Sequence, residues 1–468
     1  MDAPPARGVA SPGDVSRLVL SARQAAAAIR ARPPGTRWLL DCDNDADGLC
    51  AAAVTALALL RAGHRFTIRP SRDKQEAHYR ALLAEPVDGF LTLDKGTSHA
   101  AQLAADPQRK GRPVVVVDHH NVPAAAHDGV VMLNPRTVGL DGSRDASGAT
   151  TALALALELA GPTAWTWAPI ALSGAVGDWQ HMGGWQGWNL AVVQEATKQG
   201  HLRMVAMPRF IGVSLAEALS HARPAIPGLQ GDPQASAQFL ASIQVDADAE
   251  VEELDVEART RLVSAVVARH LAHGASGAGL DRLVGPLEWN VRLDASLRQV
   301  FRLVDACGRE GNPQAALAWL MGDAAAKAEV TACFQSYRQA LSAGVRALRD
   351  GGVAKRQALQ VAWTERADYT GMVAGIGMTH IVADRSRPLA VLAPRPDGKV
   401  QASTRGTHEQ VAAGLDLGAA CSVAAQAAGS EGGGHPVAAG AVIAKETVEP
   451  FLAALDAALI AQKFLGGA

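Results

Sequence analysis

Cysteine is scarce in this chain, and the few that occur form no pattern. There is no CxxC pair and no zinc-finger spacing of cysteine with histidine among Cys42, Cys50, Cys307, Cys333 and Cys421. The sequence therefore indicates neither a disulfide framework nor structural zinc. With 468 residues, the chain is long enough to form roughly two or three domains with hydrophobic cores that need no disulfide bond or structural zinc. We expect a cytoplasmic protein.

Excess charge and aromatic residues are also lacking. Lys and Arg number 44 against 46 Asp and Glu, which gives a formal net charge of −2. This balance argues against a lysine-coated chain that binds nucleic acid indiscriminately, but it leaves room for a local basic groove. Aromatic residues make up only 4% of the chain, so a broad base-stacking surface is not indicated. Composition therefore does not indicate the substrate class, which must be inferred from the residues of a binding or catalytic site.

Uninterrupted apolar runs of membrane-spanning length are missing too. Residues 1–24 lack the apolar core of a secretion signal. The most apolar stretch, residues 151–177, is divided by Glu158, Gly161 and Pro169. We predict two buried helices there and no association with a membrane.

Residues 1–205 alternate short apolar runs with helix-forming stretches, which is typical of a parallel α/β sheet. The expected strands are 38–40, 66–69, 89–93, 114–117 and 130–133. In such sheets ligands bind beyond the carboxyl ends of the strands. The chain then becomes helical and loop-rich until about residue 350, where strand-like runs return.

The fold class predicted from this pattern is α/β, with three parts. They are a parallel-sheet catalytic domain at 1–205, a helical inserted or linking region at 206–350, and a smaller α/β substrate-binding domain at 351–468.

Four aspartates alternate at the end of the first expected strand, in LLDCDNDADG: Asp41, Asp43, Asp45 and Asp47. Carboxylates this close repel one another and raise each other's pKa unless a cation neutralises them. A divalent metal is the simplest remedy. DNDADG also fits the opening of a calcium loop, but Val54 occupies the position of its bidentate glutamate and the preceding segment is strand-like. A solvated acidic turn is the other alternative.

Asp118, His119 and His120 follow another buried-strand run, in VVVVDHHN. Adjacent histidines point in different directions, so one can bind a metal while the other faces a substrate phosphate. Two histidines beside a strand are more often structural, but the aspartate cluster favours ligation here. Asp94 and Asp178 are further candidate ligands, although a lone aspartate after a strand is usually a cap or turn residue.

A glycine-rich segment near the C-terminus, SEGGGHPVAAGA, is a candidate phosphate-binding turn. Gly433 and Gly434 let the backbone approach a ligand, and His435 can donate to a phosphate oxygen. Arg405, in QASTRGT with Ser403, suits bidentate binding of phosphate. A plain loop before a strand is the alternative.

Three tryptophans follow Asp178 closely: Trp179, Trp185 and Trp188. They could stack nucleobases near the site, while packing in the core or in a loop is the more common role of such residues.

Together the motifs DNDADG, LDKGTS, VVVVDHHN, AVGD and GGGHPVAAG resemble the DHH phosphoesterase superfamily over nearly the whole chain. The chain further resembles the RecJ-type exonucleases, in particular the archaeal branch that associates with the GINS complex, through VDACGREGN, GMVAGIGMTHIV and AGLDL. The resemblance implies two Mn²⁺ or Mg²⁺ ions in a cleft between two domains, and two-metal hydrolysis of phosphodiesters.

It also implies metal ligation by residues matching Asp45, Asp47, Asp94, His119 and Asp178. His120 is then expected to meet the scissile phosphate and to protonate the leaving oxygen or stabilise the transition state, with Asp118 as the other catalytic residue. Many relatives carry a histidine shortly before the aspartate pair, where this chain has Asp41 and Asp43. We expect Asp43 to bind metal before Asp41. The added oxygen donor favours Mn²⁺ or Mg²⁺ over zinc.

The favoured function is a single-strand-specific exonuclease, acting on DNA or RNA in replication, repair or RNA processing. One alternative is a small-substrate phosphodiesterase for oligonucleotides, cyclic dinucleotides or polyphosphate. Another is a replisome scaffold with residual nuclease activity, bound to GINS or replicative helicase proteins. The complete set of motif residues argues against a purely structural role.

Overall fold

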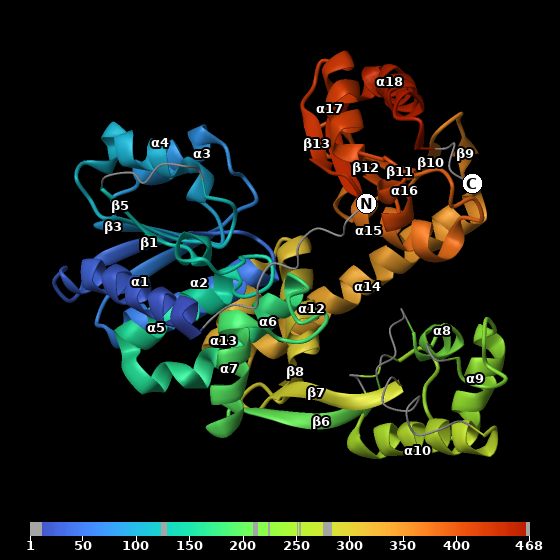
Figure 1. The fold of residues 1–468 in the computed structure, drawn as a ribbon, viewed down its shortest axis with the longest axis horizontal. Coiled ribbons are helices and arrows are strands. Elements are labelled where there is room, and N and C mark those ends of the chain that lie inside the picture. The colour runs from blue at the N-terminus through green and yellow to red at the C-terminus, as the bar shows by residue number, and fades with distance from the viewer. Residues whose placement is uncertain are drawn as a thin grey trace. The chain divides into compact units, whose positions relative to one another are not determined.

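The structure is a computed structural model that describes residues 12–122, 129–208, 214–222, 225–249, 251, 254–274 and 283–464. The chain divides into two compact units, Met1–Phe334 and Gln335–Ala468. Figure 1 shows the elements of both units.

Five parallel strands form the main sheet of the first unit, in the order β2-β1-β3-β4-β5. They are β1 (Arg37–Cys42), β2 (Arg65–Pro70), β3 (Gly89–Leu93), β4 (Val114–Val117) and β5 (Val130–Leu133). Strands β3 and β4 are buried along their whole length, as expected where helices cover both faces of a sheet. All five predicted strands are confirmed.

Helices lie on both faces of this sheet (Figure 1). One face packs against α3 (Glu76–Leu83) and α4 (Ala100–Ala105), whose leucines join Leu39, Phe90 and Val116 in one hydrophobic cluster. The other face packs against α1 (Pro12–Arg30), α2 (Ala46–Arg61) and α5 (Gly148–Ala160).

The apolar stretch at residues 151–177 forms two helices. These are α5 and α6 (Ala168–Gly177), joined by a 3-10 segment at Gly161–Trp167, and most residues of both helices are buried. The prediction of two buried helices is therefore confirmed. Among the described residues, no helix has both the length and the apolar character needed to cross a membrane.

The region predicted as helical also contains a small sheet. Its helices are α8 (Leu215–Ser220), α9 (Pro233–Ser242), α10 (Val256–Ala272), α12 (Leu297–Arg309), α13 (Pro313–Met321) and α14 (Ala326–Gly351). After α7 (Gly187–Lys198), the strands β6 (Leu202–Pro208), β7 (Val284–Asn290) and β8 (Ala295–Ser296) pair antiparallel. The sequence pattern did not indicate this sheet. Helix α12 packs against α6, and α13 packs against α2.

The second unit contains a mixed sheet of six strands in the order β13-β14-β12-β11-β10-β9. They are β9 (Ala354–Lys355), β10 (Gln360–Trp363), β11 (Leu389–Pro394), β12 (Lys399–Arg405), β13 (Gly432–His435) and β14 (Ala438–Ala444). Only the pair β10–β11 is parallel among them. The predicted strand-like runs therefore form β10, β11 and β12.

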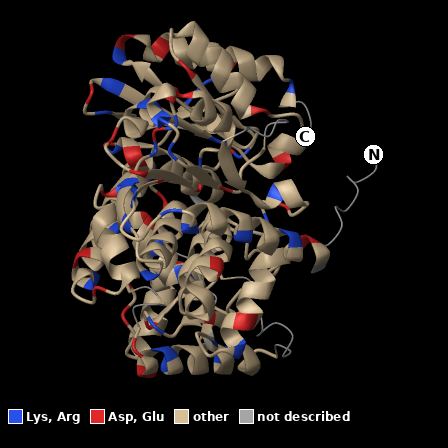
Figure 2. Ribbon diagram, turned by 90° about the vertical axis from the view of Figure 1, so that its left-hand side faces the viewer, with Lys and Arg blue, Asp and Glu red and all other residues tan. Residues whose placement is uncertain are grey.

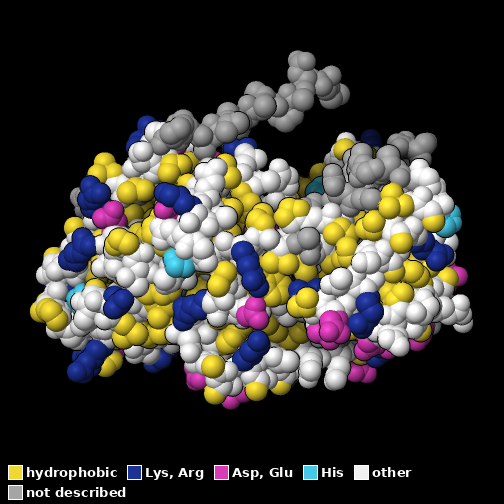
Figure 3. All heavy atoms as spheres, turned by 90° about the horizontal axis from the view of Figure 1, so that it is seen from below, with side chains coloured by type: hydrophobic (Ala, Val, Ile, Leu, Met, Phe, Trp, Pro, Cys, Tyr) yellow, Lys and Arg dark blue, Asp and Glu magenta, His cyan; other side chains and the backbone are white. Residues whose placement is uncertain are grey.

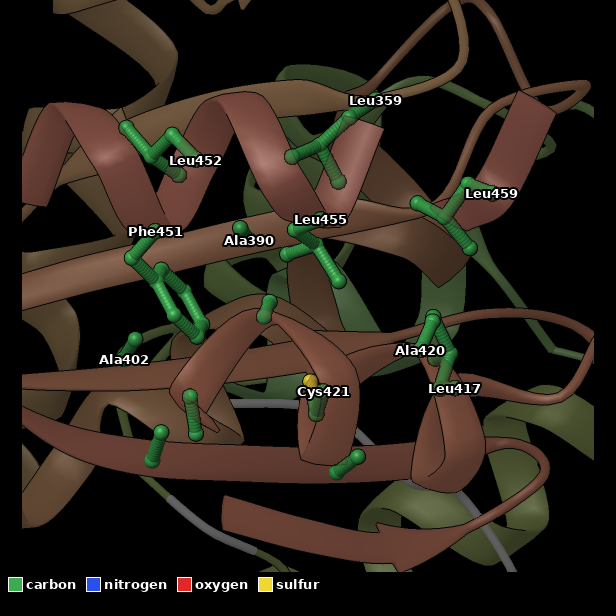
Figure 4. Packing of buried hydrophobic residues seen from close by; sticks show 14 of the residues in the cluster. Leu359, Ala390, Ala402, Leu417, Ala420, Cys421, Phe451, Leu452, Leu455 and Leu459 are labelled. Carbon is green, nitrogen blue, oxygen red and sulfur yellow. The ribbon is translucent and has the colours of Figure 1, made fainter. Parts of the chain in front are cut away.

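Among the described residues, the C-terminal part of α14 packs against this sheet. The other helices of the unit are α15 (Thr370–Ile376), α16 (His408–Ala412), α17 (Leu417–Ala427) and α18 (Val448–Ala461). Figure 4 shows how side chains of α17 and α18, among them Cys421, Phe451 and Leu455, pack with Ala390 and Ala402 of the sheet. This cluster gives the second unit a hydrophobic core of its own.

Charged residues of both signs are distributed along the described chain (Figure 2). On the face displayed in Figure 3, Lys and Arg side chains lie among hydrophobic and polar ones. In the described part of the chain, several Lys and Arg side chains form ion pairs, for example Arg69 with Glu85 at 3.2 Å and Arg395 with Asp397 at 3.3 Å. This distribution agrees with the near-neutral net charge.

Candidate metal centre

The carboxyl ends of β1, β3 and β4 bring the acidic motifs to one edge of the sheet. Asp43 follows β1 directly, Asp94 follows β3, and Asp118 follows β4. Because these three strands are neighbours in a parallel sheet, the loops that leave them lie side by side.

Helix α2 begins within the aspartate loop. Asp45 is its N-cap, with Oδ1 accepting a hydrogen bond from the Gly48 backbone N–H at 3.0 Å. At position 48 a Cβ would lie 2.4 Å from the Asp43 carbonyl oxygen. The tight turn from strand to helix therefore requires glycine here.

Asp47 lies in the first turn of α2 and is held by the N-terminus of α5. Its carboxylate accepts hydrogen bonds from Ser147 Oγ at 2.7 Å, Gly148 N at 2.6 Å and Ala149 N at 3.1 Å. A Cβ at Gly148 or Gly174 would lie within 2.9 Å of an Asp47 oxygen. Two glycines thus make room for a carboxylate that the helix N-terminus stabilises.

The two ring nitrogens of His119 have different surroundings: Nδ1 is hydrogen-bonded to the backbone, and Nε2 faces the acidic side chains. Nδ1 bonds to the carbonyl oxygen of Gly142, so it carries the proton in neutral imidazole. Nε2 lies 3.1 Å from Asp94 Oδ1, 3.2 Å from Asp178 Oδ2 and 3.9 Å from Asp47 Oδ2. The free nitrogen therefore faces three carboxylates, the arrangement of a metal-binding histidine.

Asp118 orients His120. One oxygen accepts from His120 Nδ1 at 2.7 Å, and the other accepts from Thr97 N at 3.0 Å. Burial alone would raise the pKa of Asp118, but the hydrogen bond and charge of His120 hold it below the usual range. The side chain of His120 is 52% exposed. With Nδ1 engaged, Nε2 is the nitrogen that can meet a substrate.

The acidic groups near His119 resist ionisation. Burial, followed by the charge of Asp43, raises the pKa of Asp45 to about 6. Burial and the charge of Asp47 raise the pKa of Asp178 to about 7 and the pKa of Asp94 well above its ordinary value. Oδ1 of Asp94 is buried, and it faces Nε2 of His119 at 3.1 Å. A cation would relieve the repulsion and would give this oxygen a bond to the metal.

The ligand atoms fall into overlapping groups whose members lie within 4.8 Å of one another. The groups are Asp43, Asp45 and Asp94; Asp47, His119 and Asp178; and Asp94, Asp118, His119 and His120. In the third group, Asp118 Oδ1 and His120 Nδ1 are hydrogen-bonded to each other at 2.7 Å, so the first two groups are the better candidates. Carboxylates with a single imidazole suit Mn²⁺ or Mg²⁺, so the residues present fit such ions.

Asp41 and Asp43 differ in their partners. Asp41 is fully buried, and its Oδ1 lies 2.7 Å from Lys95 Nζ and 3.1 Å from His78 Nε2. Asp43 belongs to a candidate ligand group, and its Oδ2 lies 2.5 Å from Lys74 Nζ. The geometry favours Asp43 over Asp41 as a ligand. Sequence reasoning missed the role of Lys95, although a lysine directly after Asp94 was visible in LDKGTS.

The predicted phosphate-binding residues of the second unit lie on adjacent strands. Across β14, Ser403 and Gly433 both pair with Gly440, and Arg405 and His435 both pair with Ala438. Cross-strand partners share a face of a sheet, so all four residues lie on the same face. The glycine-rich segment is thus the edge strand β13, which corrects the expectation of a turn or loop. Its neighbour Gly434 also lies in β13.

Arg405 is positioned by its surroundings. Its Nη1 donates to the Thr404 carbonyl at 2.8 Å. At Gly371, in the first turn of α15, a Cβ would lie 2.7 Å from the other guanidinium nitrogen. Burial lowers the pKa of Arg405, which nevertheless stays cationic at neutral pH. Gly371, the first glycine of GMVAGIGMTHIV, therefore makes room for the half-buried guanidinium of Arg405.

Comparisons with known families and proteins agree with this architecture. Residues 39–174 match the N-terminal domain of the DHH family, and residues 357–461 match the DHHA1 domain. A protein of Methanocaldococcus jannaschii, described as uncharacterized, is 24% identical over 425 residues, covering 88% of this chain and 91% of that protein.

Several solved structures share the fold. Exonuclease RecJ bound to manganese superimposes with a TM-score of 0.60, 20% identity and 94% coverage of each chain. RecJ of Thermus thermophilus in complex with Mn²⁺ gives 0.59 and 20% identity, with 98% of this chain covered. This chain spans only 56% of that RecJ. CDC45 of Entamoeba histolytica gives 0.60 at 11% identity, with 96% and 99% coverage.

Fold, acidic edge and matched domains together define a phosphoesterase. The chain belongs to the DHH superfamily and has a RecJ-like structure, which places it in a family of hydrolases.

Proposed function

We propose that this protein is a metal-dependent exonuclease that hydrolyses phosphodiester bonds of single-stranded DNA or RNA. The observation that carries the proposal is the convergence of His119 Nε2 with the carboxylates of Asp47, Asp94 and Asp178. The raised pKa values of Asp45 and Asp178 support it, because ions at this edge would offset the repulsion that raises them. The RecJ-like fold supports the same substrate class.

Two Mn²⁺ or Mg²⁺ ions are proposed to occupy the two candidate groups, Asp43, Asp45 and Asp94 in one and Asp47, His119 and Asp178 in the other. Bound there, such ions polarise phosphate oxygens and lower the pKa of water.

His120 and Asp118 act on the substrate side of the proposed site. Asp118 stays ionised and holds Nδ1 of His120 at 2.7 Å. Nε2 can then donate a proton to the leaving oxygen, or a hydrogen bond to a nonbridging oxygen of the scissile phosphate. In the second unit, Arg405 and His435 are proposed to donate to a phosphate, with Ser403 and the backbone at Gly433 and Gly434 beside them.

End-labelled single strands of DNA and RNA test this proposal directly. The protein is incubated with Mn²⁺, Mg²⁺ or chelator, and products are resolved by length. We expect stepwise shortening that needs the cation. Asp178→Asn should slow it by about 100-fold, whereas Asp350→Asn, an exposed aspartate at the end of α14, should match wild type. Equal rates for all three folded proteins would refute the proposed metal centre.

The alternatives make different predictions with the same labelled substrates. A small-substrate phosphodiesterase would cleave a dinucleotide much faster than a long strand, and an exonuclease would degrade both. A replisome scaffold with residual nuclease activity is the second candidate, because the fold matches CDC45 along nearly the whole of both chains. That role predicts a stable complex with GINS or replicative helicase proteins in size-exclusion chromatography.

A further inference from the structure

Trp179 is an exposed tryptophan directly beside the candidate metal centre. It is 64% exposed, although the preceding residue is Asp178, whose Oδ2 lies 3.2 Å from His119 Nε2. Its backbone φ is 60°, a left-handed conformation that bulky residues rarely adopt. Strain of this kind concentrates at functional sites. The turn thus presents an indole to solvent one residue from the acidic cluster.

The turn is tied to the metal centre on its other side as well. Gln180, which follows Trp179, is buried, and its Nε2 donates at 2.9 Å to the Gly142 carbonyl that also bonds His119 Nδ1. Its Oε1 accepts from Asn189 Nδ2 at 2.7 Å. Since Asp178 contacts His119 and Gln180 is buried against the Gly142 carbonyl, the backbone of Trp179 is fixed relative to His119.

Two other aromatic rings lie in the same turn as the indole of Trp179. The ring of His181 lies nearly parallel to that of Trp179, with centroids 6.3 Å apart and planes inclined by 20°. Trp185 follows at 6.0 Å from His181, and its Nε1 donates to Glu288 Oε1 on β7 at 2.8 Å. This aromatic row, Trp179, His181 and Trp185, is anchored at one end and exposed at the other.

Trp188 shows the contrasting case. It is only 4% exposed, and its Nε1 donates to the Thr150 carbonyl at 2.7 Å. Trp188 therefore packs in the hydrophobic core. Core packing does not explain Trp179, which is exposed and has a strained backbone.

We infer that Trp179 is a stacking platform for a nucleobase of the substrate, at or next to the nucleotide whose phosphate is cleaved. Adjacent Cα atoms are about 3.8 Å apart, so the backbone that carries the indole lies directly beside Asp178 of the acidic cluster. Every base has a π face, so such a platform tolerates any sequence. The inference rests on the proposed function and narrows its substrate to base-bearing phosphodiesters, in preference to polyphosphate.

Equilibrium binding of two labelled single strands tests this platform, one strand complete and one with abasic sugars at both ends. Binding is measured by fluorescence anisotropy in chelator, and the rate of shortening is then measured in Mn²⁺. Wild type should bind the complete strand about 10-fold more tightly than the abasic one.

Three variants identify the ring as the cause. Trp179→Asn removes it while favouring the left-handed backbone, and should bind both strands equally, at the abasic level. Trp179→Phe keeps a ring and should retain most of the difference. Met182→Ala, in the same turn and at a residue 62% exposed, should behave as wild type.

Each outcome bears on a separate claim. Equal affinity of wild type for the two strands overturns the platform, and so does a Trp179→Asn variant that still discriminates. If Trp179→Asn instead lowers turnover of both strands alike without changing affinity, the residue only positions Asp178, and the inference fails. Discrimination in binding without any shortening in Mn²⁺ upholds the platform and refutes the proposed exonuclease.

Discussion

At the scale of residues, the aspartate and the two histidines that follow β4 make separate contacts. Hydrogen bonds from Thr97 and His120 occupy Asp118, while Nε2 of His119 faces Asp94 and Asp178. Consecutive positions in the sequence therefore have different surroundings, and we propose that His119 binds metal while His120 faces the substrate.

The first prediction concerns His120 and Asp118. Asp118→Asn removes the charge that orients His120, and His120→Gln removes the proposed donor, so each should lower kcat by about 100-fold or more. Neither residue belongs to the two favoured ligand groups, so Mn²⁺ affinity, measured by calorimetry, should stay within a few-fold of wild type. A fall in Mn²⁺ affinity as large as the fall in kcat would assign these residues to the metals instead.

The second prediction concerns the buried pair Lys95–Asp41. Lys95 is 2% exposed, and its Nζ also donates to the Ser71 carbonyl at 3.0 Å, so it links the ends of β1, β2 and β3. Lys95→Met leaves a buried carboxylate without its main partner and should lower the free energy of unfolding by about 3–5 kcal/mol. The double variant Lys95→Met with Asp41→Leu should recover most of this loss, as urea unfolding can measure. No recovery would mean that packing of the lysine stem, rather than charge, is what matters.

The sequence allowed much of the candidate site to be predicted because its carboxylates stand in short motifs after apolar strands. Lys95 and Gln180 could not be assigned in the same way. Their roles depend on contacts with Asp41 and with the Gly142 carbonyl, which lie far away along the chain.

At the scale of elements, the strands that could be predicted from the sequence were those rich in apolar residues. The valines of β4 marked a buried strand without ambiguity. Strand β6 was missed because its partner β7 lies some 80 residues further on, at 284–290 against 202–208. Strand β13 was missed because glycines carry no side chains that identify a strand.

The third prediction addresses the contact between α12 and the aspartate loop. At Gly308 a Cβ would lie 2.5 Å from the backbone oxygen of Asn44, and Asn44 Nδ2 donates to the Gly308 carbonyl at 3.0 Å. Gly308→Val should therefore displace the loop that carries Asp43 and Asp45, and lower Mn²⁺ affinity about 10- to 100-fold. Gly351→Ala, where a Cβ meets open space, is the matched control. Wild-type affinity in a folded Gly308→Val protein would show that α12 does not position the ligands.

At the scale of the whole molecule, the chain combines a parallel-sheet unit with a second unit that has its own core. Sequence patterns predicted an α/β fold with these two ends, and the structure and the family matches confirm it. The boundaries at 205 and 350 stay predictions. They were drawn from composition, whereas α12 and α13 pack against helices of the first sheet through contacts that composition does not reveal.

The last prediction couples the candidate site to global stability. In chelated protein the pKa values of Asp45 and Asp178 are raised to about 6 and about 7, against about 3.9 in an unfolded chain. Between these values the folded state binds more protons than the unfolded state. The free energy of unfolding in chelator should therefore fall as pH rises from about 4 to 7.

Manganese should reverse this trend, because it binds the ionised carboxylates and competes with their protons. At pH 8, Mn²⁺ at 100 times its dissociation constant should add about 2.7 kcal/mol to the free energy of unfolding, and the same concentration should add little at pH 5. Urea titrations at both pH values, with and without the ion, give the four free energies needed. Asp178→Asn cannot ionise at this position, so its stability in chelator should depend less on pH. An equal gain from Mn²⁺ at pH 5 and pH 8 would place the bound ion away from these two aspartates.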